Sequence, residues 1–356
     1  MAGIFGHLNL SDSDYIMSVT VGQQIIWDTA MEYIAESQRM LDAALSMFVE
    51  RTTDDYKFRY KLPSGGYLQR RAHDGSYAAV KGYGQWDVAF PLEDFGARLA
   101  SNDIDIAYMT VGELDRWIST VVIQNVNTVR YELLKAIFNN TQDSFIDPLL
   151  GTLLVEPLAN GDAVVYPPVI GAEVEATEDH YMESGYTTAN ISDTNNPFVT
   201  ISDDLVHHFG EATNPNIAVI INTAERAKVE ALTDYDEVYD RFIRPGADAD
   251  LLVGVPSGIP GEVIGRVSGC WVSVWSWIPA TYMYGTSLDA EAPVIQRVDL
   301  AGLGLASGLS LVAEDEEFPF QNAFWRHRFG FGVGNRLNGV MMEISDGGTY
   351  TVPSGF

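Results

Sequence analysis

The sequence contains a single cysteine, Cys270, and no long uncharged apolar run. One cysteine excludes a disulfide framework or a cysteine-based zinc site within one chain. Cys270 lies in the apolar stretch 270–278, where we expect a small buried hydrophobe and not a reactive thiol. No apolar run reaches the roughly eighteen residues of a membrane-spanning helix, and residues 1–17 lack the basic start and apolar stretch of a signal peptide. We therefore expect neither a membrane span nor secretion by a signal peptide.

The sequence also lacks the common signatures of nucleophilic, metal-dependent and nucleotide-binding enzymes. It has no Gly-x-Ser-x-Gly, His-Glu-x-x-His, Cys-x-x-Cys or Gly-x-x-x-x-Gly-Lys motif. His207 and His208 are adjacent, so on a helix they point about 100° apart and are poorly placed for one metal ion. The glycine-rich stretch 329–334 lacks the strand-turn-helix context of a dinucleotide site, and we expect a twisted or bulged strand there. The sequence predicts no catalytic residue, cofactor or metal, although a conventional α/β enzyme stays a rival interpretation.

Positive charge is scarce, since 49 acidic residues face 21 basic ones and give a net charge of −28. Such a surface repels phosphate polymers, because binding to nucleic acid depends on lysine and arginine displacing condensed counterions. The same self-repulsion opposes association of the chain with its own copies at low salt, and salt screens it. We infer adaptation to a salt-loving host, against the plainer alternative of an ordinary acidic protein.

A third of the basic residues, 7 of 21, lie in residues 51–90. The alternation of aromatic and basic residues over 56–60, the turn at 63–66 and the resumption over 67–71 predict a long two-stranded hairpin. An isolated ribbon of two strands is marginal in water, so it needs a surface to lie on. An acidic neighbouring copy would be complementary, and the alternative is that the ribbon lies on its own domain. The candidate contact residues are Arg51, Lys57, Arg59, Lys61, Arg70, Arg71 and Lys81.

One helix is predicted before this ribbon and another after it. Apolar residues from Ile26 to Phe48 recur mostly every three or four positions, which predicts an amphipathic helix within 23–50. Thr110 and Glu113 form a capping box at the start of a periodic stretch, which predicts a helix over 110–139. At 1.5 Å per residue that helix would be roughly 43 Å long, as in the spine of an elongated subunit.

The segment 201–314 has the pattern of a separate α/β unit. We expect a helix capped by residues 202–204 and running to 209, and a buried strand over 216–222. A further helix is expected from 223 to 232, and strands over 262–267 and 271–278. Strands over 323–329 and 337–344 are expected to return to the earlier domain. The acidic residues between 173 and 183 are what composition alone gives, and we assign them no metal.

The order of these segments resembles the major capsid proteins of tailed double-stranded-DNA viruses, which have the Hong Kong 97 phage capsid fold. Residues 85–91 resemble the end of that family's extended loop, 263–279 its late axial-domain strands and 318–333 its return strand. The resemblance implies an α+β fold with an N-terminal arm (1–50), an extended β-hairpin loop (51–90) and a peripheral domain (91–200 and 315–356). The peripheral domain would contain the spine helix over 110–139, and the axial α/β domain would span 201–314.

The resemblance further implies a structural subunit and not an enzyme. Its copies would form hexamers and pentamers of an icosahedral capsid that encloses double-stranded DNA without binding it specifically. The expected location is the virion, after assembly in the host cytoplasm, with decoration, scaffolding and portal proteins as candidate partners and no membrane. An encapsulin-like protein nanocompartment, which has the same fold and encloses enzymes, is the alternative.

The charge balance gives a first prediction. Raising NaCl from about 50 mM to about 2 M should increase the free energy of unfolding, because the screening length falls to roughly 3 Å at 1 M salt. Urea denaturation at the two salt concentrations measures this. Equal stability in both would contradict the inferred adaptation to salt.

Overall fold

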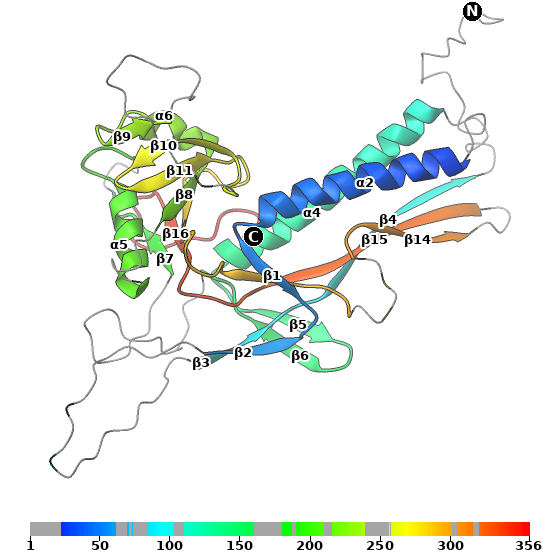
Figure 1. The fold of residues 1–356 in the computed structure, drawn as a ribbon, viewed down its shortest axis with the longest axis horizontal. Coiled ribbons are helices and arrows are strands. Elements are labelled where there is room, and N and C mark those ends of the chain that lie inside the picture. The colour runs from blue at the N-terminus through cyan, green and yellow to red at the C-terminus, as the bar shows by residue number, and fades with distance from the viewer. Residues whose placement is uncertain are drawn as a thin grey trace, which may run out of the picture. The chain divides into compact units, whose positions relative to one another are not determined.

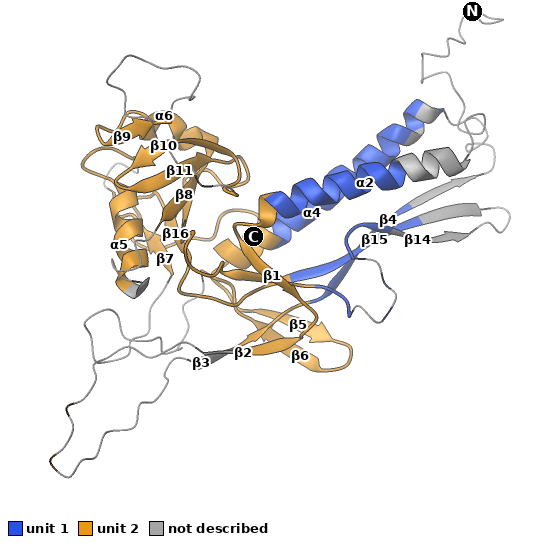
Figure 2. Ribbon diagram, viewed as in Figure 1, with its two compact units in different colours: residues 1–43, 92–132, 298–330 blue, residues 44–91, 133–297, 331–356 orange. Residues whose placement is uncertain are grey.

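The computed structural model describes residues 23–61, 70, 73, 85–102, 110–159, 180–186, 190–209, 216–238, 256, 258–300, 303, 305, 307–315 and 320–356. The chain divides into two compact units (Figure 2). Unit 1 comprises residues 1–43, 92–132 and 298–330, and unit 2 comprises 44–91, 133–297 and 331–356. Within the described part of the chain, no helix has the length and apolar character needed to cross a membrane.

Unit 1 combines long helices with an antiparallel sheet. Strand β15 (Phe320–Val333) pairs on one side with β14 (Ser310–Asp315) and on the other with β4 (Glu93–Asn102). Ile34 of helix α2 (Gln23–Leu45) and Val122 of helix α4 (Val111–Phe138) are buried against Trp325 of β15. Each helix therefore contributes a buried apolar side chain to the contact with β15.

The predicted capping box forms at the start of α4. The backbone N–H of Thr110 donates to Glu113 Oε2 at 3.0 Å, and the backbone N–H of Glu113 donates to Thr110 Oγ1 at 3.2 Å. These bonds satisfy N–H groups that have no partner within the helix. The helix predicted over 110–139 is confirmed, with observed bounds Val111–Phe138.

Unit 2 is built on a mixed seven-stranded sheet, whose order is β7-β16-β12-β8-β11-β10-β9 (Figure 1). The central strand β8 is buried at all five positions, pairing parallel with β11 and antiparallel with β12. Both faces of this strand are therefore covered, which explains its continuous run of apolar residues. The bounds are β7 Tyr181–Glu183, β16 Val340–Glu343, β12 Tyr282–Ser287, β8 Ile217–Ile221, β11 Cys270–Val274, β10 Glu262–Val267 and β9 Tyr235–Glu237.

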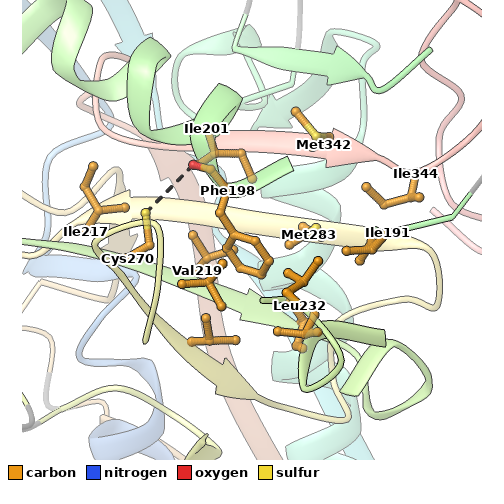
Figure 3. Close-up of a cluster of buried hydrophobic side chains, with 14 of the residues drawn as sticks. Ile191, Phe198, Ile201, Ile217, Val219, Leu232, Cys270, Met283, Met342 and Ile344 are labelled. Carbon is orange, nitrogen blue, oxygen red and sulfur yellow. Dashed lines mark hydrogen bonds between the residues drawn. The ribbon is translucent and has the colours of Figure 1, made fainter. Parts of the chain in front are cut away.

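The core of this sheet forms under helix α5 (Pro197–Phe209), as Figure 3 shows. Phe198 of α5 points among side chains of several strands, including Val219 and Met283. Cys270 is buried in the same cluster, and its Sγ lies 3.9 Å from the Phe198 carbonyl oxygen. The prediction that Cys270 is a small buried residue is confirmed. The short helices η3 (Thr223–Glu225) and α6 (Arg226–Val229) follow β8.

Three smaller strand pairs complete unit 2. Strand β1 (Val49–Thr53) runs parallel to β13 (Val294–Arg297), which neighbours β15 in the sheet order. Strands β2 (Lys57–Lys61) and β3 (Gln85–Ala89) form one antiparallel pair. Strands β5 (Asp143–Asp147) and β6 (Gly151–Val155) form another.

Several expected element bounds were wrong. The helix expected from 202 begins at Pro197, because the Asn196 side chain accepts the Phe198 N–H at 3.1 Å and proline suits the first helical turn. The strand expected over 271–278 ends at Val274, where the chain turns. The strand at 57–61 pairs with 85–89, while the expected partner segment 67–71 lies outside the described residues except for residue 70.

The C-terminal strands separate between two sheets. Strand β15 pairs with β4, as expected for a return to the earlier domain, whereas β16 pairs with β12 in the seven-stranded sheet. Residues 340–343 therefore pair on one side with β12 of 201–314 and on the other with β7, which lies in the segment 91–200 with which the sequence grouped them. The expected domain bounds as a whole stay a prediction.

The buried centre of β8 gives a second prediction. Replacing Ile221 by alanine should lower the free energy of unfolding by about 2–5 kcal/mol, because Ile221 is fully buried and its loss leaves a cavity. Ile123→Ala is the matched control, since the Ile123 side chain on α4 is 59% exposed and should change stability by no more than about 0.5 kcal/mol. Urea denaturation of both variants measures the difference, and equal effects would contradict the packing described.

Candidate interaction surface

The β2–β3 pair forms the base of the basic ribbon predicted over 51–90. Asp87 of β3 lies directly opposite Arg59 of β2 and accepts the Arg59 Nε hydrogen bond at Oδ1, at 2.8 Å. Lys57 Nζ lies 2.8 Å from the other carboxylate oxygen. The hydrogen bond from Arg59 lowers the pKa of Asp87 most, and the one from Lys57 lowers it further. The pKa therefore lies well below its ordinary range. The carboxylate therefore stays ionised and offsets part of the ribbon's positive charge.

Arg51 of β1 lies against Phe58 of strand β2. Its guanidinium sits 5.3 Å from the centre of the Phe58 ring, within the range of a cation–π contact. The Arg51 side chain remains exposed to solvent. This contact orients a positive charge on the surface without neutralising it.

These contacts involve three of the seven predicted contact residues, Arg51, Lys57 and Arg59. The side chains of Arg51, Lys57, Arg59 and Arg70 are described, and all four are exposed. Lys57 and Arg59 bind Asp87 of their own chain, so the ribbon base is less positive than its sequence indicates. The Lys61 side chain, Arg71 and Lys81 lie outside the described residues. A contact of these seven residues with another copy stays a prediction.

A second hairpin, β5–β6, packs against the ribbon base. Phe145, Leu153 and Val155 project from one face of this hairpin and pack with Ala89 of β3. Side chains alternate between the two faces of a strand, so the intervening residues face away from that contact. Ile146 and Leu154 are on this opposite face, where they are 74% and 54% exposed.

The turn of this hairpin is held by a buried ion pair. Asp147 pairs with Gly151 across the strands, so the connecting residues are Pro148, Leu149 and Leu150. The Asp147 carboxylate accepts the backbone N–H groups of Leu149 at 2.9 Å and Leu150 at 3.1 Å. Gly151 has φ +80°, a conformation that favours glycine and is typical of three-residue hairpin loops.

Arg297 of β13 clamps this turn to the ribbon base. Its Nη2 lies 3.3 Å from Asp147 Oδ2, and its Nη1 donates to the Phe90 carbonyl oxygen at 2.8 Å. Both side chains of the ion pair are buried. The N–H groups of Leu149 and Leu150 and the Arg297 guanidinium lower the pKa of Asp147.

The fixed turn presents apolar side chains to solvent. Leu149 is 93% exposed, and Leu150 is exposed as well. This hairpin was not predicted from the sequence, where no strand was expected over 143–155. The segment Asp147-Pro-Leu-Leu-Gly151 was the available signal, because aspartate, proline and glycine occupy positions that such a turn favours.

The fold has counterparts among solved structures. No family model matches the sequence, and no curated protein matches it either. A structure of Mycobacterium phage Patience matches with a TM-score of 0.70 at 18% identity, covering 97% of this chain and 94% of that one. The mature capsid of bacteriophage PhiM1 matches with a TM-score of 0.50 at 10% identity, covering 82% of this chain and 83% of that one.

The chain has the Hong Kong 97-type capsid fold. The predicted fold class is thereby confirmed. Assignment of 51–90 to the extended loop of the Hong Kong 97-type fold stays a prediction, and the described part of that segment is the base formed by β2 and β3.

In this Hong Kong 97-type chain, Cys270 and the glycine-rich stretch are both structural. Burial raises the pKa of the Cys270 thiol to about 11, which makes it a poor nucleophile near neutral pH. Residues 329–333, which include most of the glycine-rich stretch, lie within strand β15 as expected. A Cβ at Gly332 would lie 2.5 Å from the Phe90 ring, so this glycine permits close packing. Among the described residues, no group of three or more histidine, cysteine, aspartate or glutamate side chains is arranged to hold a metal ion.

The Asp147–Arg297 pair gives a third prediction. Because the pKa of Asp147 is lower in the folded chain, its charge stabilises the fold above about pH 4, near the ordinary pKa, and this stabilisation is lost as pH falls through the folded value. Asp147→Asn should therefore be less stable than the wild type at pH 7 and match it more closely in strong acid. Urea denaturation across this pH range measures the difference. A difference that is independent of pH would contradict an ionised Asp147.

Proposed function

We propose that this chain is a structural subunit whose copies assemble into hexamers and pentamers of an icosahedral capsid that encloses double-stranded DNA. The observation that carries the proposal is the fold match along nearly the whole chain, 97% of it in the Mycobacterium phage Patience comparison. The PhiM1 comparison adds a protein whose structure is described as a mature capsid. The virion is accordingly the proposed location, and this role needs no catalytic residue.

The charge of the chain supports this role. A net charge of −28 gives a wall to which packaged DNA does not adhere, because the phosphates and the protein surface repel one another. The subunits must nevertheless hold together, so their contacts have to avoid or offset like charges. The exposed Arg51 beside the ribbon base and the exposed apolar face of the β5–β6 hairpin are two surfaces that do so.

We propose that the basic ribbon contributes to contacts between copies. Arg51 is the best-placed of its described residues, because it is exposed and is held by Phe58 and not by a carboxylate. Lys57 and Arg59 contribute less net charge, since both bind Asp87 of their own chain. Decoration, scaffolding and portal proteins are further candidate partners, and the salt-loving host stays a prediction.

Assembly of the purified chain gives a fourth prediction. Negative-stain electron microscopy in about 2 M NaCl, where repulsion is screened, should show closed shells. Arg51→Glu should lower the yield of shells because it reverses a charge at the proposed contact. Arg39→Glu is the matched control: Arg39 is an exposed arginine on α2 whose ion pair with Glu36 lies within one helix.

The outcomes of this experiment separate the proposals. A chain that stays monomeric at all salt concentrations would contradict the capsid role. Shells that form equally well with either variant would contradict the contact at Arg51 while leaving the capsid role intact. Shells that contain an enzyme and no nucleic acid when isolated from their natural source would favour the nanocompartment.

A further inference from the structure

The β5–β6 hairpin concentrates exposed apolar side chains in a short segment. Ile146, Leu149, Leu150 and Leu154 are all exposed and lie within nine consecutive residues. Elsewhere in the described part of the chain, large exposed apolar side chains occur singly or in pairs, such as Leu300 and Leu303. Single exposed apolar residues are normal on a soluble protein, whereas a contiguous group marks an interaction site. We call these four residues the hairpin patch.

The hairpin patch is held in one conformation before any partner arrives. Asp147 fixes the backbone N–H groups of Leu149 and Leu150, and Arg297 fixes Asp147. The opposite face of the hairpin is anchored by Phe145, Leu153 and Val155 against Ala89. A surface that is already ordered loses little conformational freedom on binding, which favours association.

The surroundings of the hairpin patch point to a second copy of the chain as its partner. The patch is too small to hold a stable dimer by itself, because a standard interface buries about 1,600 Å² in total. It suits an assembly in which each copy makes several contacts, and it lies on the face of the hairpin opposite to the one that packs against Ala89 of β3. Its four apolar side chains carry no charge, so copies of an acidic chain can meet there without like-charge repulsion between those side chains.

We propose that the hairpin patches of neighbouring copies pack against one another when the chain assembles. This inference rests on the proposed capsid function and adds a specific contact to it. Within the described residues, the hairpin carries four of the exposed large apolar side chains, so the same patch on another copy offers a matching apolar surface. Contact of identical patches is also what a two-fold axis between subunits produces.

Site-specific crosslinking tests this contact. Cys270 is the single cysteine of the chain and is buried, so Leu149→Cys introduces one accessible thiol on the hairpin patch. In assembled shells a short bismaleimide should join two copies through thioether bonds at this position. Leu303→Cys is the control, because Leu303 is also exposed, at 61%, but lies outside the hairpin.

Covalent dimers of Leu149→Cys in shells, absent from dissociated chains and from Leu303→Cys, are the expected result. Shells of Leu149→Cys in which the introduced thiol stays as reactive toward a bulky maleimide as in dissociated chains would overturn the proposal. Equal crosslinking of both variants would overturn it as well, since the reagent would then report no specific contact. Failure of the unmodified chain to form shells would instead contradict the capsid function, which keeps the two proposals distinguishable.

A second pair of variants tests whether the contact matters for assembly. Ile146→Thr combined with Leu149→Ser removes apolar surface while keeping a β-branched residue in the strand. Because both side chains are exposed, thermal stability of the dissociated chain should stay unchanged, while the yield of shells should fall roughly tenfold. Leu303→Ser should retain the wild-type yield. Full assembly of the double variant would count against the proposal.

Discussion

A single buried guanidinium, that of Arg297, connects the parts of unit 2 on which the proposed contacts depend. It bonds to the carbonyl of Phe90, just after β3, and to the carboxylate of Asp147 in the hairpin turn. Arg297 itself is the last residue of β13, which pairs with β1. Three segments distant in sequence are therefore fixed by one cation. A buried ion pair adds little net stability, but losing one partner leaves an uncompensated charge, which makes the arrangement specific.

The position of this cation matters because the chain has so little positive charge to use. Its surface ion pairs, such as Arg59 with Asp87, are half exposed and contribute little to stability. They do determine where uncompensated positive charge lies on the surface. Asp87 offsets part of the charge of Lys57 and Arg59, whereas Arg51 contacts the ring of Phe58. An acidic subunit built this way associates through a few oriented contacts and not through general attraction.

The sequence predicted those elements whose signals are local. The capping box of Thr110 and Glu113 located the start of α4, and the apolar run over 216–222 located β8. The sequence could not locate the end of β11. The chain turns at Trp275, whose ring stacks on Phe48, and Phe48 is far away in sequence. The partner of β2 was missed for the same reason, since β3 begins 24 residues after β2 ends, at Gln85 against Lys61.

The β5–β6 hairpin shows why a candidate site is harder to predict than a fold. Its turn was signalled by Asp147, Pro148 and Gly151, but alternation alone does not say which face of a two-stranded hairpin meets the rest of the protein. That choice is made by Ala89, which lies on another hairpin and buries Leu153 and Val155. Only once those residues are buried do Ile146 and Leu154 become an exposed apolar face. An isolated protein gains nothing from such a face held rigidly outward, whereas a subunit among identical copies can bury it.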